Sequence, residues 1–333
     1  MNIKKESTGG GLRSLVGTRA FYKKVLLVAV PIMIQNGITN FVSLLDNIMV
    51  GQVGTEQMSG VAIANQLVFI FNLCIFGAVA GAGILGAQFY GSGNSEGVRD
   101  TFRFKLLFGV ILSAIFAVIF LTVGEPLIQQ FIHQGEGIGD LEATRSYGKA
   151  YLEVIVIGIL PFALTQCYSG TLRETGETVI PMIAGIIAVL VNLVFNYILI
   201  FGKLGAPELG CVGAAIATVL SRFVELAIVA GWTHKHVARN PFIRGALRSF
   251  KIPGSLLKQI IAIGLPLFIN ELMWSFGITF MTQCYSVRGL EVVAAFNIAN
   301  TISNVFNVVF LSLGNSVGII IGQMLGAGRL EEA

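Results

Sequence analysis

Charged residues are scarce in this sequence: Asp, Glu, Lys and Arg make up 12% of its 333 residues, whereas 54% are apolar. Soluble globular domains carry about twice that share of charge, so the composition argues against a soluble fold. Apolar stretches long enough to cross about 30 Å of hydrocarbon recur along the whole chain. The composition therefore predicts an all-α, polytopic membrane protein.

Patterns typical of metal sites, nucleotide sites and enzymes are also missing. The four cysteines (Cys74, Cys167, Cys211, Cys284) stand singly, with no C-x-x-C spacing, and the three histidines (His133, His234, His236) are expected in loops. There is no Walker A pattern. The G-x-G-x-x-G match at Gly81, Gly83 and Gly86 lies inside an apolar helix with no strand before it, which indicates close helix packing instead. We expect no cofactor, no structural metal, no nucleotide or nucleic acid partner and no enzymatic activity.

Eight apolar segments can be delimited, and each predicts one membrane-spanning helix. They cover residues 22–50, 57–90, 102–124, 150–171, 178–202, 210–233, 257–286 and 291–325. Several are longer than 25 residues, so tilted helices or helices that extend beyond the bilayer are expected.

The chain contains an internal sequence repeat. Its first copy aligns without a gap on a later stretch of the sequence, in a register that pairs Pro31 with Pro266. Between residues 26–97 and 261–332, 16 of 72 positions are identical. Such a period predicts two lobes of one architecture, in the same orientation, because six helices separate the two starts. The predicted parts are a basic tail (1–21), a six-helix N-lobe (22–233), a linker (234–256) and a two-helix start of a C-lobe (257–333). Two complete lobes would need about four more helices, so either the chain is truncated or a partner supplies the rest.

Lysine and arginine are distributed unevenly about the predicted spans. One side of the spans holds 17 of the 22 basic residues, and the other holds Arg145, Lys149, Lys203 and Arg288 beside several acids. The positive-inside rule then places both termini in the cytoplasm. We expect the chain to lie in the plasma membrane. The linker, rich in basic residues, is interpreted as a tether that lets the two lobes rock.

Five motifs stand in order along the chain: Ser43 to Gly51 (SLLDNIMVG), Gly86 to Gly93 (GAQFYGSG), Leu172 to Pro181 (LRETGETVIP), Asn192 to Gly202 (NLVFNYILIFG) and Gly213 to Thr218 (GAAIAT). Together they are similar to the motifs of the MATE (multidrug and toxic compound extrusion) family of the MOP flippase superfamily. The resemblance implies a secondary antiporter. It would export organic cations, drugs or amphipathic metabolites in exchange for Na⁺ or H⁺ by alternating access, as a monomer at full length. Its partners would be the lipid bilayer and a small amphipathic substrate.

Two alternatives to an antiporter stay open. A flippase for a lipid-linked precursor belongs to the same superfamily, but it would need more basic residues inside the bundle to hold a pyrophosphate. Only Arg222 is expected within a span, which disfavours that activity. A non-transporting fragment is the other alternative.

Carboxylates within a span are costly, so each one is a functional hypothesis. Asp46 is the foremost, and the resemblance implies that it belongs to an N-lobe cation or proton site together with Asn192, Asn196 and Thr218. The two asparagines are spaced i, i+4 and so share one helix face. Carboxylate, amide and hydroxyl oxygens suit Na⁺. Some MATE relatives carry an acid where Asn196 stands, so the choice between Na⁺ and H⁺ is left open, as are a capping role for Asp46 and a packing role for the asparagines.

A substrate or second cation site is predicted around the seventh segment. Many members of the family have a glutamate in this helix. The nearest glutamate in this chain is Glu271, whereas the position typical of the family's glutamate, about one turn further on, is occupied by Trp274. Met33, Phe41 and Met273 are candidates for an adaptable apolar lining, although they could equally face lipid. Arg222 and Glu225, spaced i, i+3, predict a structural ion pair. Glu153 is interpreted as a buried, hydrogen-bonded acid.

Overall fold

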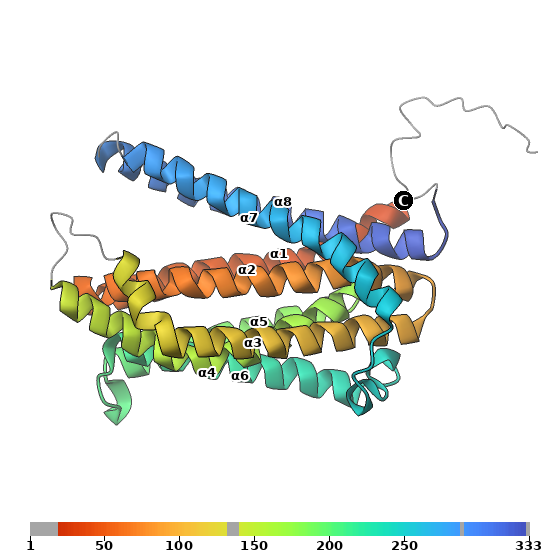
Figure 1. Cartoon of the computed structure of the whole chain (residues 1–333), viewed down its shortest axis with the longest axis horizontal. Helices are drawn as coiled ribbons and strands as arrows, with labels where there is room; N and C mark the ends of the chain where they lie inside the picture. The colour runs from red at the N-terminus through yellow and green to blue at the C-terminus, as the bar shows by residue number, and fades with distance from the viewer. Residues whose placement is uncertain (1–18, 132–139, 287–289, 331–333) are drawn as a thin grey trace, which may run out of the picture.

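The chain folds into eight long α-helices with short connections (Figure 1). The computed structural model describes residues 19–131, 140–286 and 290–330, and these contain no β-strand. The helices are α1 (Arg19–Gly51), α2 (Thr55–Gly91), α3 (Ser95–Phe131), α4 (Leu141–Glu174), α5 (Val179–Ile200), α6 (Gly210–Lys235), α7 (Gly254–Ser286) and α8 (Leu290–Gly326). Three single turns of 3₁₀ helix, η2 (Lys203–Gly205), η3 (Pro241–Ile243) and η4 (Ala246–Arg248), lie in connections. The prediction of an all-α chain is confirmed.

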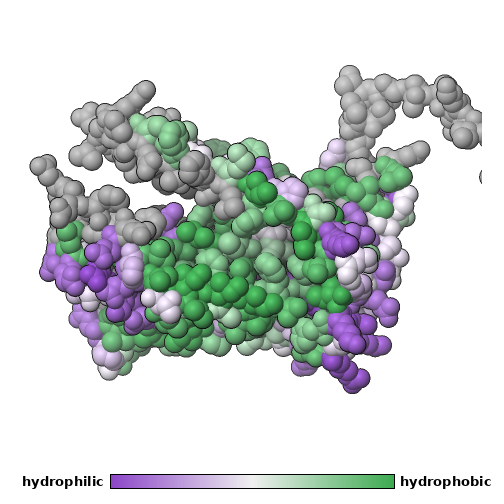
Figure 2. Space-filling model, viewed as in Figure 1, coloured by the Kyte–Doolittle hydropathy of each residue, from purple (hydrophilic) through white to green (hydrophobic). Residues whose placement is uncertain are grey.

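The surface has the polarity of a membrane protein. Seven helices of the described residues are long and apolar enough to cross a bilayer, and α7 adds the shorter apolar stretch Gly254–Asn270. Figure 2 shows a broad hydrophobic band across the molecule with hydrophilic residues at both ends. Such a band can be exposed only where lipid covers it, so the prediction of a multi-pass membrane protein is confirmed.

Polar caps extend two of the helices beyond their apolar segments. Asn94 Oδ1 accepts a hydrogen bond from Gly97 N (2.9 Å), so α3 begins at Ser95 rather than at residue 102. Asp140 likewise accepts from the backbone nitrogens of Glu142 (3.0 Å) and Ala143 (3.2 Å), and α4 begins at Leu141. These turns satisfy backbone donors that hydropathy does not register. The three basic residues Arg99, Arg103 and Lys105, which were counted with the cytoplasmic side, all lie within α3.

The first six helices form one bundle in which α4 is central. It packs against α2, α3 and α6, while α5 packs against α6 and α1. Glycine allows the closest of these approaches: a Cβ at Gly60 on α2 would lie 2.6 Å from the carbonyl oxygen of Thr144 on α4. Around this contact Phe71, Ile75 and Leu152 form the apolar core. Small residues thus bring backbones together where dispersion must replace the hydrophobic effect.

Helices α7 and α8 cover α1 and α2 at one end of the bundle and diverge from them towards the other (Figure 1). One apolar cluster joins Val25 and Val28 of α1 to Ile320 and Met324 of α8. A second cluster joins Ile260 and Ile263 of α7 to Leu85 and Phe89 of α2. In the register of the internal repeat, each of these residues of the first cluster is equivalent to one of the second. The contact between α1 and α8 is therefore repeated as the contact between α7 and α2.

The same symmetry governs the closest contact between α2 and α8. A Cβ on Gly91 would run into the carbonyl oxygen of Gln323, and a Cβ on Gly326 would run into that of Gln88. The register of the repeat exchanges these two pairs as well. Nearby, a Cβ at Gly81 would meet the backbone of Gly264, which confirms that the G-x-G-x-x-G match serves helix packing.

The connection between α6 and α7 is partly docked on the bundle. Arg103 of α3 donates to the carbonyl oxygens of Gly245 (2.8 Å) and Ala246 (3.0 Å), and Arg99 donates to that of Phe242 (3.3 Å). Phe242 is 2% exposed and packs edge-on against Phe102. Residues 241–246 are thus held by the bundle, and only the stretch up to residue 253 is left to act as a tether.

We predict that Gly91→Ala and Gly326→Ala each lower the thermal unfolding midpoint by several degrees. The added methyl group would press on backbone atoms of the facing helix, and overpacking of this kind costs roughly 1–3 kcal/mol. Gly318→Ala on the same α8 is the matched control, because its Cβ would meet nothing within 4 Å. Equal midpoints for Gly326→Ala and Gly318→Ala would contradict the close contact.

Candidate cation and substrate site

Asp46, Asn192, Asn196 and Thr218 are brought together between α1, α5 and α6. Asn196 Nδ2 donates to Asp46 Oδ1 at 2.6 Å. The two asparagines are 6% and 1% exposed, whereas Asp46 and Thr218 are half-buried. The four residues predicted as a site are thus neighbours in space.

The sequence of α5 explains why both amides face inward. Small residues recur with them on one helix face: Ala184, Gly185, Ala188, Asn192 and Asn196 are all buried. A Cβ at Gly185 would lie 2.7 Å from Gln35 Nε2 of α1, so this face lets α1 approach closely. The opposite face exposes Leu190, Val194 and Tyr197. The amides therefore project into the bundle beside Asp46.

The Asn192 amide can be oriented in two ways within this group. In one orientation it donates to Thr218 Oγ1 (3.2 Å) and accepts from Asn196 Nδ2 (3.2 Å). In the other its nitrogen donates to both carboxylate oxygens of Asp46 at 3.1 Å, and its oxygen accepts from Thr218 Oγ1 at 3.2 Å. The second orientation solvates a bare carboxylate. The first presents an amide oxygen to Asp46, as suits a proton or cation held between the two.

The donor set fits a hard cation. Asn196 Oδ1 is buried and has no hydrogen-bond partner among the described residues. Buried acceptors of this kind usually have a partner, so an unmet one beside a carboxylate suits a ligand. Together with Asp46, Asn192 and Thr218 it offers carboxylate, amide and hydroxyl oxygens, the ligands that Na⁺ and similar hard ions take. Protonation of Asp46 is the alternative to a bound cation, because the protonated carboxyl group can donate a hydrogen bond to a neighbouring oxygen.

Arg222 and Glu225 of α6 form the ion pair that their i, i+3 spacing predicts. Arg222 Nη1 is 3.3 Å from Glu225 Oε2, and the Glu225 side chain is 6% exposed. The guanidinium also sits 4.9 Å from the ring centroid of Phe162, and it interacts electrostatically with Asp46. The pair therefore borders the Asp46 group.

Three of the residues predicted to line a substrate site lie on open helix faces. Phe41 of α1 is 61% exposed, and Met273 and Trp274 of α7 are 71% and 62% exposed. Met33 is half-buried, and the side chain of Glu271 lies outside the described residues. Asn36, the repeat mate of Glu271, donates to Ser312 Oγ of α8 at 3.0 Å, a contact between α1 and α8 that the sequence did not reveal.

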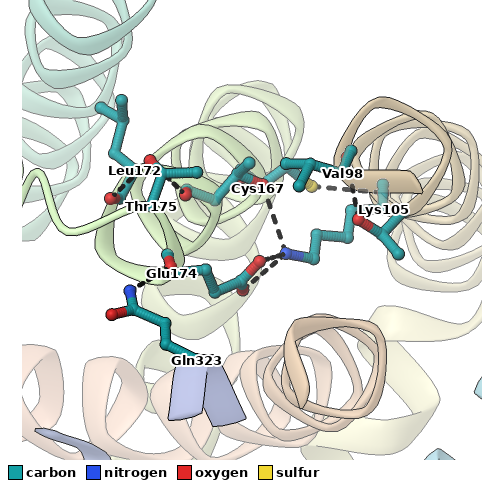
Figure 3. Close-up of polar contacts among 9 residues, drawn as sticks. Val98, Lys105, Cys167, Leu172, Glu174, Thr175 and Gln323 are labelled. Carbon is teal, nitrogen blue, oxygen red and sulfur yellow. Dashed lines mark hydrogen bonds and ion pairs between the residues drawn. The ribbon is translucent and has the colours of Figure 1, made fainter. Parts of the chain in front are cut away.

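A second polar cluster was missed altogether. Lys105 Nζ of α3 lies 2.6 Å from each carboxylate oxygen of Glu174 at the end of α4, and 3.2 Å from Thr171 Oγ1 (Figure 3). The Lys105 side chain is fully buried and that of Glu174 is 7% exposed. From α8, Gln323 Nε2 donates to the Glu174 carbonyl oxygen (2.8 Å). The available signal was Lys105 itself, a basic residue inside the predicted apolar segment 102–124.

Small residues make room for this ion pair. A Cβ at Gly83 would lie 2.6 Å from Glu174 Oε1, and one at Gly86 would press on Oε2. Next in the chain, Arg173 Nη2 donates to Gln35 Oε1 of α1 at 2.7 Å. The glycines of α2 therefore serve both backbone packing and the accommodation of a buried carboxylate.

Two interpretations of charged residues were wrong. Glu153 is exposed rather than buried, because its position on α4 points away from the packed faces. Arg222 is also not the only basic residue within a span, since Lys105 lies inside the candidate span Ser95–Gln129. Lys105 is, however, fully engaged by Glu174 and Thr171.

Eight long helices with a polar group enclosed among three of them define a multi-pass helical membrane protein. Two separate stretches, residues 31–198 and 266–333, match the family described as MatE. The chain belongs to the MatE family. The two matched stretches begin at Pro31 and Pro266, which are equivalent positions of the internal repeat.

The chain is similar to proteins with drug-resistance names. It is 29% identical to the probable multidrug resistance protein NorM of Thermotoga maritima over 93% of this chain and 64% of the relative. Identity to a protein of the same name from Oceanobacillus iheyensis is 28%, over 93% of this chain and 68% of the relative. The chain thus spans about two thirds of their length.

Solved structures of MATE proteins share the fold. A crystal structure of MATE in complex with MaD3S superposes with a TM-score of 0.83 at 25% identity, over 98% of this chain and 70% of that one. An outward-facing multidrug resistance MATE transporter gives 0.83 at 24% identity, over 98% and 69%. The helix arrangement described above is therefore that of MATE proteins.

We predict that Lys105→Met and Glu174→Gln each destabilise the protein strongly, by about 3–5 kcal/mol, because each leaves the other partner buried without its counter-charge. The double variant Lys105→Met/Glu174→Leu should recover most of the loss. Unfolding midpoints in detergent measure this. Glu125→Gln is the control, since its pairs with Arg145 and Lys149 are partly exposed and its effect should be much smaller. A double variant less stable than either single one would contradict the pairing.

Proposed function

We propose that this chain is the ion-coupling part of a secondary antiporter that exports organic cations, drugs or amphipathic metabolites in exchange for Na⁺ or H⁺. The observation that carries the proposal is the Asp46 group: one carboxylate, two buried amides and a hydroxyl, held inside a bundle of a multidrug-transporter family. No enzymatic step is part of the proposal. The names of the relatives support the class of substrate.

The Asp46 group suits an exchange mechanism because its carboxylate can be satisfied in two ways. Without a ligand, Asn196 and a turned Asn192 donate to the carboxylate. With a cation or proton on Asp46, the amide oxygens face the charge instead. The change costs an amide rotation rather than the unfolding of a helix. An exchanger needs this reversibility, because it must bind and release its ion in every cycle.

The proposed access route follows from how the helices approach. At the end with Gly91 and Gly326, α7 and α8 lie tightly on α2, and a Gln323 to Glu174 hydrogen bond adds to the contact. Helices α7 and α8 diverge from α1 and α2 towards the other end (Figure 1), and Asp46 lies near the C-terminal end of α1. Most basic residues flank the tightly packed end, so we assign it to the cytoplasm. The Asp46 group would then face the outside, and inward access would require this contact to open.

A flippase for a lipid-linked pyrophosphate is not favoured. Lys105 is a basic residue inside the bundle, but its ammonium group is occupied by Glu174 and Thr171. Two further basic side chains of the bundle are also occupied, because Arg173 donates to Gln35 and Arg222 donates to Glu225. A pyrophosphate would have to displace these partners.

We predict that Asp46→Asn in the complete gene product abolishes ion-driven efflux while membrane expression is retained, because an amide can neither release a proton nor neutralise a cation. Fluorescent cation efflux from proteoliposomes under imposed Na⁺ and H⁺ gradients measures this. Glu153→Gln is the control: it also removes one carboxylate from the bundle, but from an exposed site, and it should retain efflux. Efflux by Asp46→Asn at the rate of the control would remove Asp46 from the mechanism.

The amides allow a finer test. Asn196→Ala should raise the Na⁺ concentration for half-maximal exchange at least about tenfold if Na⁺ is the coupling ion, since the loss of one direct ligand typically costs about 1.4 kcal/mol or more. Asn196→Asp should retain exchange, because it keeps an oxygen beside Asp46. Leu190→Ala on the exposed face of α5 is the control. Unchanged half-maximal concentrations for both ions in Asn196→Ala would argue against ligation.

A further inference from the structure

The connection between α6 and α7, residues 236–253, carries positive charge that nothing in the described structure neutralises. No Asp or Glu occurs between Glu225 and Glu271. Arg239, Arg244, Arg248 and Lys251 are all exposed, and within the described ranges their side chains form no ion pair and no hydrogen bond. The proposed antiport does not use these side chains.

One of these charges, Arg244, lies on an anchored backbone, and Arg248 and Lys251 follow it within a few residues. Arg99 and Arg103 hold the carbonyl groups of residues 242, 245 and 246. Phe242, Ile243 and Ala246 are buried at 2%, 5% and 0% exposure. Arg244 therefore projects from a segment whose neighbours on both sides are anchored. Fixed cations lose less conformational entropy on binding an anion than those on a mobile chain.

Exposed apolar side chains accompany the charges. Leu247 and Phe250 are 51% and 47% exposed, and they alternate with Arg248 and Lys251. The connection follows directly on the end of α6 (Figure 1), and hydrophilic residues at this end border the hydrophobic band in Figure 2. Basic and apolar side chains mixed at the edge of such a band are typical of a segment that lies in the membrane interface.

We propose that the α6–α7 connection binds anionic phospholipid headgroups. Arg244, Arg248 and Lys251 would contact headgroup phosphates, while Leu247 and Phe250 enter the interfacial layer. Charge complementarity selects this occupant, because the patch has only one sign of charge and lies where headgroup phosphates are present at high density. Bound lipid would hold the connection against both the bilayer and α3, and so restrict the chain through which α7 is joined to the first six helices.

The test compares lipid retention by native mass spectrometry of the full chain taken from mixed nanodiscs, with phosphatidylcholine as the major lipid and phosphatidylglycerol as the minor one. Arg244→Gln/Arg248→Gln/Lys251→Gln should reduce the preference for retained phosphatidylglycerol over phosphatidylcholine at least about fivefold, because a single basic residue near an anionic surface contributes roughly that factor. These side chains make no described contact, so the variant should fold, which its unchanged unfolding midpoint in detergent would establish.

A charge-matched control separates a site from net charge. Lys23→Gln/Lys24→Gln/Lys258→Gln removes three exposed basic residues that also flank the tightly packed end but lie outside the connection, and it should keep most of the preference. Arg244→Lys/Arg248→Lys should bind like the original protein. Equal losses in the connection variant and the control would overturn the proposal in favour of a diffuse charge effect.

Two measurements on the unaltered protein complete the test. Phosphatidylglycerol in the nanodisc should raise the unfolding midpoint relative to phosphatidylcholine alone, and about 0.5 M KCl should remove most of this gain through screening. Inorganic phosphate at millimolar concentration should not compete. A gain that persists in the connection variant, or that phosphate abolishes, would overturn the assignment to a lipid headgroup.

Discussion

The absence of water between membrane-spanning helices is the constraint on which this structure depends. A polar group in that environment must find its partner within the protein, since an unsatisfied one costs several kcal/mol. The first six helices provide such partners at three positions along the bundle. Lys105 is paired with Glu174 at one end, Arg222 with Glu225 beside Phe162, and Asp46 with Asn196 towards the other. Of these, the Asp46 group is the one with an acceptor left unmet, Asn196 Oδ1, and that separates a group suited to exchange from pairs suited to stability.

The same constraint explains the role of glycine. Without a hydrophobic driving force between helices in lipid, close approach of backbones is the available source of attraction, and small residues permit it. Gly91 and Gly326 allow α2 and α8 to meet at backbone distance, and the internal repeat forms this contact reciprocally. The repeat also forms the flanking apolar clusters twice. The chemistry is not duplicated, because Met281 stands at the repeat position of Asp46. The first helix of each copy instead carries its acidic residue at a different position, because Asn36 stands at the repeat position of Glu271.

The contacts at the tightly packed end link this frame to the ionic groups. Glu174 holds Lys105 through its carboxylate and receives Gln323 at its carbonyl oxygen, so α3, α4 and α8 meet at one residue (Figure 3). Its neighbour Arg173 reaches Gln35 of α1. Separation of α8 from this end would break a single neutral hydrogen bond at Glu174, which is worth about 1 kcal/mol, while the buried ion pair stays intact. Glu174 therefore joins α3 to α4 through a buried ion pair, whereas it joins α8 through a neutral hydrogen bond.

Hydropathy and spacing predicted the helix count and the membrane class, whereas the resemblance to the MATE family predicted the partnership of Asp46 with Asn192, Asn196 and Thr218. The first two properties follow from bilayer thickness and from a repeat visible residue by residue, and the i, i+4 spacing adds only that the two asparagines share one helix face. Tertiary structure decided the rest. Lys105 and Glu174 stand 69 positions apart, and no local pattern reveals that packing buries them together. The docking of Phe242, the exposure of Glu153 and the open faces of Met273 and Trp274 likewise depend on which helix sides meet. Hydropathy is a property of each segment, whereas the partner of a buried charge is chosen by the distant helix that packs against it.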